Sequence, residues 1–254
     1  MKFLFVCIVV LIMTSNLHSQ SANEVAKRLS NPLGYISVPF QSNIDFNIQP
    51  NNGFRWTMNL LPIIPFSLNK NFNVINRLVV PVISQSDIFK GTTQTGISDL
   101  LVNSFLSPKN SSVVWGIGPA VSFPSGFPDE VATKKWGAGP NVIAMKTSGR
   151  LIVGALLFHL WSFAGSAERP DYSFTYFQPV SLYNFNAEWG MGLSAEISNE
   201  WMKKVSNGAL IFQGSKLMNV YGQLVNFVLG PKYYFGNFRK PELGIRASVN
   251  LLFP

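Results

Sequence analysis

The chain has 254 residues, of which 47% are apolar and 13% are charged, and its formal net charge is +8. This length suits one large β domain, and no segment after the N-terminal run has the ~18 uninterrupted apolar residues that a membrane-spanning helix needs. The basic residues are scattered singly rather than clustered with aromatic residues, so nucleic acid is not an expected partner.

The N-terminus has the pattern of a secretory signal peptide. Lys2 precedes an apolar run over 3–13, and small and polar residues follow. We therefore expect residues 1–19 to be removed, with cleavage after Ser21 as the alternative. The only cysteine, Cys7, lies inside that run. A secreted chain whose mature form has no disulfide suits a barrel that is closed by hydrogen bonds.

A short helix is predicted next, over 23–30, within a helix-and-linker segment of residues 20–32. Asn23 is a suitable N-cap, and the dipeptide Asn31-Pro32 ends the segment. Two interpretations stay open. The helix is either a partial plug at the periplasmic mouth of the barrel or a mobile periplasmic tag.

Residues 33–254 alternate between apolar and polar side chains with the two-residue period of a β-strand. Prolines inside several of the strands predict bulges, because proline removes a hydrogen bond from the ladder. The pattern predicts an all-β fold, a single up-and-down antiparallel transmembrane barrel of about twelve strands. The predicted strands cover 36–48, 54–68, 73–84, 97–107, 113–123, 136–146, 151–162, 172–183, 189–201, 209–215, 224–235 and 242–253.

The last strand resembles the C-terminal signal of bacterial outer-membrane barrels, which the barrel assembly machinery reads. Arg246 lies on its polar face, and the one departure is Pro254, which follows the aromatic residue that usually ends such chains. The apolar face is expected to contact lipid and to form the assembly signal. Its residues are Ile245, Ala247, Val249, Leu251 and Phe253.

Charged side chains are expected to face the lumen, because an arginine near the middle of the membrane on the lipid side costs ~2–4 kcal/mol. His159 joins them as a lumen or interface histidine beside Trp161. The connections after the third, fifth and seventh strands are the longer ones, so both termini should lie on the periplasmic side. The predicted lumen-lining residues are Asp45, Arg55, Arg77, Asp99, His159, Glu196, Lys232 and Arg246.

Several stretches resemble a family of bacterial outer-membrane proteins that is grouped with the meta-cleavage phenol-degradation pathway and often mislabelled as neuromedin U precursors. The region 202–223 departs most from that pattern. The resemblance implies an outer-membrane barrel with a transport role, and it supplies no established substrate or catalytic residue. The matching stretches are NEVAKRLSNPLGYISVPFQSN (23–43), PFSLNKNFNVINRLVVPVI (65–83), the SP of SFLSPK (104–109), WGIGPAVSFP (115–124), KKWGAGPNVIAMK (134–146), HLWSFAG (159–165), FQPVSLYN (177–184) and LLFP (251–254).

No catalytic, cofactor or metal site is expected from the residues. His159 is the only histidine outside the N-terminal signal region. A strand would place His159 and Ser162, three residues apart, on opposite faces, so a lipase-like Ser–His pair is not predicted. The carboxylates are single residues on different strands, which gives no metal-ligand spacing.

The leading hypothesis is therefore a channel or transporter in the bacterial outer membrane that passes small solutes passively, with apolar or aromatic solutes among the candidates. Outer-membrane lipid, lipopolysaccharide and the barrel assembly machinery are its expected partners. The alternative is a narrow, largely filled barrel that is structural or adhesive and acts through its extracellular loops, since twelve strands lie between the filled barrels of about 8 strands and the open ones of about 16. A lipid-modifying hydrolase comes third.

Overall fold

The computed structural model describes residues 35–109 and 111–253. The predicted signal peptide and the predicted helix over 23–30 lie outside these residues. Within them, no helix is long and apolar enough to cross a membrane. The elements are one short 3-10 helix, η1 (Asp129–Val131), and the strands β1 (Ser37–Ile48), β2 (Gly53–Leu60), β3 (Ile63–Ser67), β4 (Phe72–Ser86), β5 (Thr93–Ile97), β6 (Leu100–Pro108), β7 (Val114–Phe123), β8 (Lys135–Ser148), β9 (Leu151–Gly165), β10 (Ser173–Asn184), β11 (Trp189–Glu200), β12 (Val205–Val220), β13 (Gln223–Gly236) and β14 (Leu243–Leu252).

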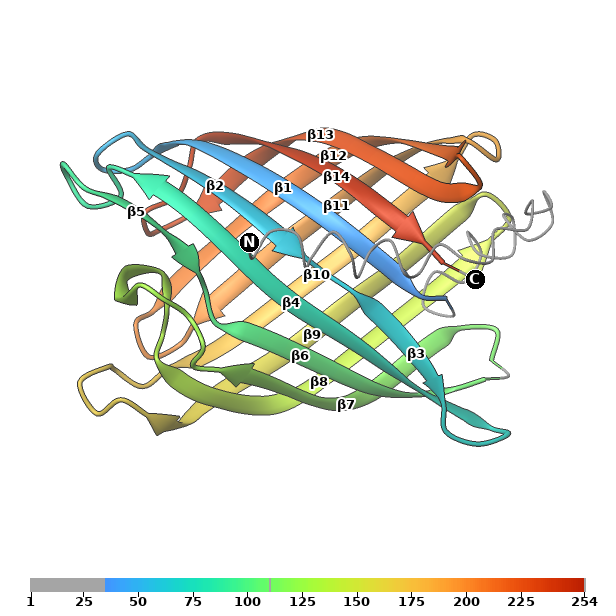
Figure 1. Ribbon diagram of the computed structural model, residues 1–254, viewed down its shortest axis with the longest axis horizontal. Coiled ribbons are helices and arrows are strands. Elements are labelled where there is room, and N and C mark those ends of the chain that lie inside the picture. The colour runs from blue at the N-terminus through green and yellow to red at the C-terminus, as the bar shows by residue number, and fades with distance from the viewer. Residues whose placement is uncertain (1–34, 110, 254) are drawn as a thin grey trace.

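The strands form one closed antiparallel barrel. β1 pairs with β14 from Ser37↔Leu252 to Phe46↔Leu243, which joins the two ends of the sheet. β2 and β3 are two parts of one strand, since both pair with β4, and the same holds for β5 and β6. The barrel therefore has 12 strands, which confirms the predicted all-β, up-and-down architecture. Figure 1 shows these strands tilted around a common axis.

One strand break contains a proline, Pro62, and the other lies opposite a proline, Pro81 of β4. Between β2 and β3, Leu61 N donates to Pro39 O at 2.9 Å, and Leu78 N donates to Pro62 O at 3.0 Å. Between β5 and β6, Ser98 N donates to Pro81 O at 2.8 Å. Proline has no N–H to give to a ladder, so the chain kinks locally and the neighbouring amides find other partners.

Two details of the predicted strands are wrong. The tenth strand was expected over 209–215, but β12 is longer, because the alternation continues beyond that window with buried Leu217 and exposed Met218. In the sequence, the charged Lys216 interrupts the apolar residues of the outward face. In the structure it still points outward, and its ammonium lies 4.8 Å from the centre of the Trp189 ring. In β1, the alternation over 36–48 predicts that Ile48 points outward like Phe46, and this is wrong. Asn47 has a φ of 54° and the pairing shifts register, so Ile48 turns inward and is 1% exposed.

The two ends of the barrel differ. The loops after β4, β7 and β9 gather at one end, which we call the loop end, and the start of β1 lies beside the end of β14 at the other (Figure 1). The outer face between the ends carries many exposed apolar side chains, such as Trp115, Leu193 and Leu229. An apolar surface of this extent needs a membrane to cover it.

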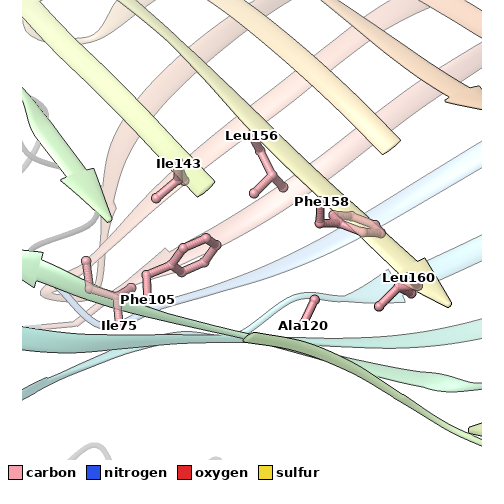
Figure 2. Close-up of a cluster of buried hydrophobic side chains, with 7 residues drawn as sticks. All are labelled: Ile75, Phe105, Ala120, Ile143, Leu156, Phe158 and Leu160. Carbon is pink, nitrogen blue, oxygen red and sulfur yellow. The ribbon is translucent and has the colours of Figure 1, made fainter. Parts of the chain in front are cut away.

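The inside of the barrel is filled along one side. Inward-facing residues of β4, β6, β7, β8 and β9 pack into an apolar cluster, shown in Figure 2. The ring of Phe158 stacks against that of Tyr176 on β10, with centroids 5.1 Å apart. The interior space is thus confined to the remaining side and to the loop end. The members of the apolar cluster are Ile75, Phe105, Ala120, Ile143, Leu156, Phe158 and Leu160.

Candidate functional site

Charged and polar side chains meet inside the barrel on the side opposite the apolar cluster. Arg246 on β14 places Nη2 2.8 Å from Glu196 Oε1 on β11, and its Nε donates to Asn43 Oδ1 at 2.8 Å. Lys232 on β13 donates to the same Asn43 oxygen at 3.2 Å and lies 3.7 Å from Asp45 Oδ1. These five residues form what we call the charged cluster.

Barrel closure is what assembles the charged cluster. Asn43 is directly opposite Arg246 in the β1–β14 ladder, and β13 supplies Lys232 from the next strand. Further inward side chains support it: Tyr234 OH donates to Asp45, and Gln178 Nε2 donates to Glu196 at 3.5 Å. The Lys232 and Arg246 side chains are each only 5% exposed, so their ion pairs are partly desolvated.

Two further guanidinium groups face the interior without a carboxylate partner. Arg55 Nε donates to Gln85 Oε1 at 2.9 Å, and Arg77 Nη1 donates to Asn103 Oδ1 at 3.1 Å. Neither arginine forms an ion pair within the described part of the chain. Asn103 is fully buried, and its Nδ2 has no hydrogen-bond partner among the described residues.

The interior therefore carries an excess of positive charge. Four cations face it, Arg55, Arg77, Lys232 and Arg246, against the two carboxylates of the charged cluster. Low-dielectric walls around such an excess concentrate the positive potential in the lumen.

Asp99, expected on the lumen wall, is among the residues that line the interior at the loop end, and it also anchors a loop. It lies between β5 and β6 and accepts hydrogen bonds from Gly126 N at 2.9 Å and Thr133 N at 2.6 Å, as well as from the Thr133 hydroxyl. Ser98 Oγ adds a bond to Val131 O at 2.5 Å. Asp99 thus holds the loop 124–134 against the mouth of the barrel, and its charge is used there rather than in the charged cluster.

His159, expected as a lumen or interface residue beside Trp161, lies on the outer face and not in the lumen. On β9 the even residues, such as Phe158, point inward, so His159 points outward with Trp161, and the two rings are 4.1 Å apart. His159 Nδ1 is 2.7 Å from Thr175 Oγ1. β9 is apolar on both faces, which left its orientation open in the sequence. Ser162 binds the Asp171 carboxylate, and no bond joins it to His159.

Sequence reasoning missed several inward polar residues. Tyr234 has the same parity as Lys232 on β13 and could have been found from that spacing. Tyr176 and Gln178 lie on β10, which is apolar on both faces, so only the pairing with β9 reveals their orientation. Within residues 35–109 and 111–253, no group of three His, Cys, Asp or Glu side chains could hold a metal ion.

Two adjoining cavities occupy the interior. The upper one, of about 530 Å³, lies at the loop end. Most of its lining residues are apolar, and four are charged: Asp99, Arg169, Glu200 and Lys203. The lower one, of about 290 Å³, is lined by the charged cluster, Arg77 and Tyr176. Val79, Leu101 and Phe158 line both cavities, so the two cavities adjoin between the loop end and the charged cluster.

No protein-family profile matches the chain, and a comparison with curated protein sequences gives no match. Among solved structures, the barrel is similar to an outer membrane channel from Pseudomonas putida F1, with a TM-score of 0.66 and 11% identity over 86% of this chain and 96% of that chain. The NanC porin follows with a TM-score of 0.48 and 10% identity over 86% and 99% of the two chains. At such identities the first likeness establishes the fold alone, which is a closed antiparallel β-barrel.

Proposed function

We propose that the protein is an outer-membrane channel through which small solutes pass. The observation that carries this proposal is the pair of adjoining interior cavities, the lower of which is lined by Arg77, a cation without an ion pair among the described residues. A filled structural barrel would have to neutralise buried charges in pairs. Arg55 and Arg77 instead have only amide partners among the described residues, which suits a lumen that holds water and solute.

The membrane setting belongs to the same proposal. The apolar outer face would contact lipid and, at the loop end, lipopolysaccharide. The apolar residues of the last strand, from Ile245 to Phe253, would be read by the barrel assembly machinery after export by the signal peptide. Ile245 and Val249 are exposed on the outer face, while Arg246 and Ser248 are buried inside, which supports the face assignment on which that signal depends.

Anionic solutes are the favoured class, because the interior has a positive excess. The test is single-channel recording of the refolded barrel in a planar bilayer under a salt gradient. Wild-type protein should give conductance steps and a reversal potential of anion preference. Arg77→Gln should reduce that preference, because Arg77 lines the lower cavity without an ion pair. Lys216→Gln, which removes a cation stacked on Trp189 outside the lumen, is the matched control.

A structural barrel is the second candidate, and the apolar cluster is the observation in its favour, since it fills one side of the interior. The same recordings separate the two functions. A correctly folded barrel that gives no steps in any salt would support the structural function and reject the channel.

A further inference from the structure

The charged side chains around the lower cavity form pairs and leave one cation over. Arg246 pairs with Glu196 at 2.8 Å, and Lys232 lies 3.7 Å from Asp45. Both carboxylates that line this cavity therefore already have a cationic partner. Arg77 is the remaining charged residue of the lining, and no carboxylate of the described residues forms an ion pair with it. The lower cavity thus has one uncompensated positive charge.

The guanidinium group of Arg77 keeps hydrogen-bond donors for a ligand. Its Nη1 donates to Asn103 Oδ1 at 3.1 Å, and Asn103 is its cross-strand neighbour on β6. Among the described residues this is the hydrogen bond that the guanidinium makes, so Nε and Nη2 remain for another acceptor. Arg77 is only partly buried and lines the cavity. Because a guanidinium group presents its donors as a planar fork, its free edge matches the two oxygens of a carboxylate.

The β4–β6 ladder places Arg77 between two apolar levels. Ile75 and Phe105, the inward pair on the side away from the loop end, are almost fully buried in the apolar cluster (Figure 2). Since their side chains fill that side, it has no room for a ligand. Val79 and Leu101, the inward pair on the side of the loop end, are only partly buried and line both cavities. A ligand on Arg77 would therefore extend toward the loop end along an apolar wall.

The charge and the wall together select a class of ligand. One uncompensated cation balances one negative charge, whereas a dianion would bring excess negative charge close to Glu196 and Asp45, which line the same cavity. An uncharged apolar solute would remove water from the guanidinium of Arg77 without replacing it. A small inorganic anion would leave the apolar wall, to which Phe158 adds an aromatic ring, without a contact.

We infer that Arg77 and this wall form a binding site for a small organic monoanion, a carboxylate joined to a compact apolar group. The carboxylate binds the free edge of the Arg77 guanidinium, and the apolar group lies against Val79, Leu101 and Phe158. The inference rests on the proposed function for the entry of anions into the lumen, and it adds which anions the lumen retains. Binding itself needs no passage through the barrel, so it can be measured apart from conductance.

The test measures equilibrium binding to the refolded barrel in detergent micelles by titration calorimetry, with protein-free micelles as the blank. The probe is benzoate at neutral pH. Benzamide has the same shape without the charge, and acetate has the carboxylate without the ring. Benzoate should bind saturably and about tenfold or more tightly than either, because each of the other two lacks one of the two contacts.

Arg77→Gln should abolish the difference in affinity between benzoate and benzamide. Arg55→Gln is the comparison, because Arg55 is an interior arginine that also bonds to an amide but lines neither cavity. Its effect on the affinity for benzoate should be small beside that of Arg77→Gln. Equal losses in the two variants would overturn the inference and leave the general positive potential of the lumen as the cause. Equal affinities of the wild type for benzoate and benzamide would overturn it as well.

Leu101→Asn tests the apolar wall, and it decides the inference if Arg77→Gln does not fold. This variant should lower the affinity for benzoate more than the affinity for acetate, and an equal change in both would reject the site. Planar-bilayer recording of the same preparations separates this inference from the proposed function. Conductance steps without Arg77-dependent benzoate binding would reject the site and keep the channel, whereas such binding without steps would reject the channel and keep the site.

Discussion

The sharpest test of the membrane orientation is an arginine on the outer face at mid-height. Leu229 lies near the middle of β13, points outward and is 63% exposed, so most of its side chain would contact lipid. Its cross-strand neighbours are Ala247 on β14 and Gly214 on β12, neither of which can pair with a guanidinium group. Leu229→Arg should therefore place an uncompensated cation in the hydrocarbon.

The expected cost has two parts. An arginine at the membrane midplane on the lipid face of a barrel costs about 2–4 kcal/mol. Losing the leucine side chain adds about 1–2 kcal/mol, because full transfer is worth about 1.5–3 kcal/mol and only the exposed part of Leu229 is counted. The free energy of unfolding should fall by about 3–6 kcal/mol, which is a large share of the ~5–15 kcal/mol that stabilises a typical protein.

Refolding from urea into phospholipid vesicles measures this change, with tryptophan fluorescence and the gel mobility of unheated samples as readouts. Asn226→Arg is the matched control, because Asn226 lies on the same strand, three residues away, on the lumen side opposite Asn250. It should refold as the wild type does. If the two arginine variants lost equal stability, or if Leu229→Arg lost none, the assignment of lipid and lumen faces would be wrong.

Two further predictions concern ion pairs. Glu196→Gln should lower the urea midpoint by an amount that corresponds to up to about 3–5 kcal/mol, because it leaves Arg246 buried without its carboxylate. The control Glu188→Gln, in an exposed turn, should leave the urea midpoint unchanged. Equal midpoints for the two variants would show that water already screens the ion pair. At the loop end, the hydrogen bond from Lys135 Nζ, followed by that from Ser162 Oγ, holds the pKa of the Asp171 carboxyl below its ordinary value. A carboxyl with a depressed folded-state pKa stabilises the fold above its unfolded pKa and loses that contribution as pH falls through the folded pKa. An NMR titration should therefore show the Asp171 pKa rising when Lys135 is changed to Gln, and an unchanged titration would mean that the pair does not form in solution.

Much of the barrel follows from local pattern. In β7, Gly116 and Ser122 are buried while Ile117 is exposed, as the alternation in the sequence predicts. A strand of this kind has one low-energy orientation in a membrane barrel, because its apolar face is stable only against lipid. The same reasoning placed Lys232 and Arg246 inside, and the structure puts both there. Strand positions and the number of strands could be predicted for this reason.

Local pattern fails where both faces of a strand are apolar or where the backbone shifts. On β10, Tyr176 lines the lower cavity while Phe177 is exposed outside, and nothing in their order distinguishes them. On β9, the same ambiguity left open whether His159 faces the lumen or the outside, and the structure places it outside. A positive φ at Asn47 turned Ile48 inward without any interruption of the hydrophobic period.

By itself, the sequence determined that this chain is a closed barrel with an apolar outer face and charged side chains inside. This follows because the two-residue period and the free-energy cost of a charge in lipid apply to each strand separately. Only the tertiary structure decided which charges meet. Asn43 and Arg246 bond across a separation of 203 residues, and Lys232 joins them only because β1 closes on β14. The pairing of Pro119 on β7 with Pro140 on β8 likewise depends on the register between strands, which no local period encodes.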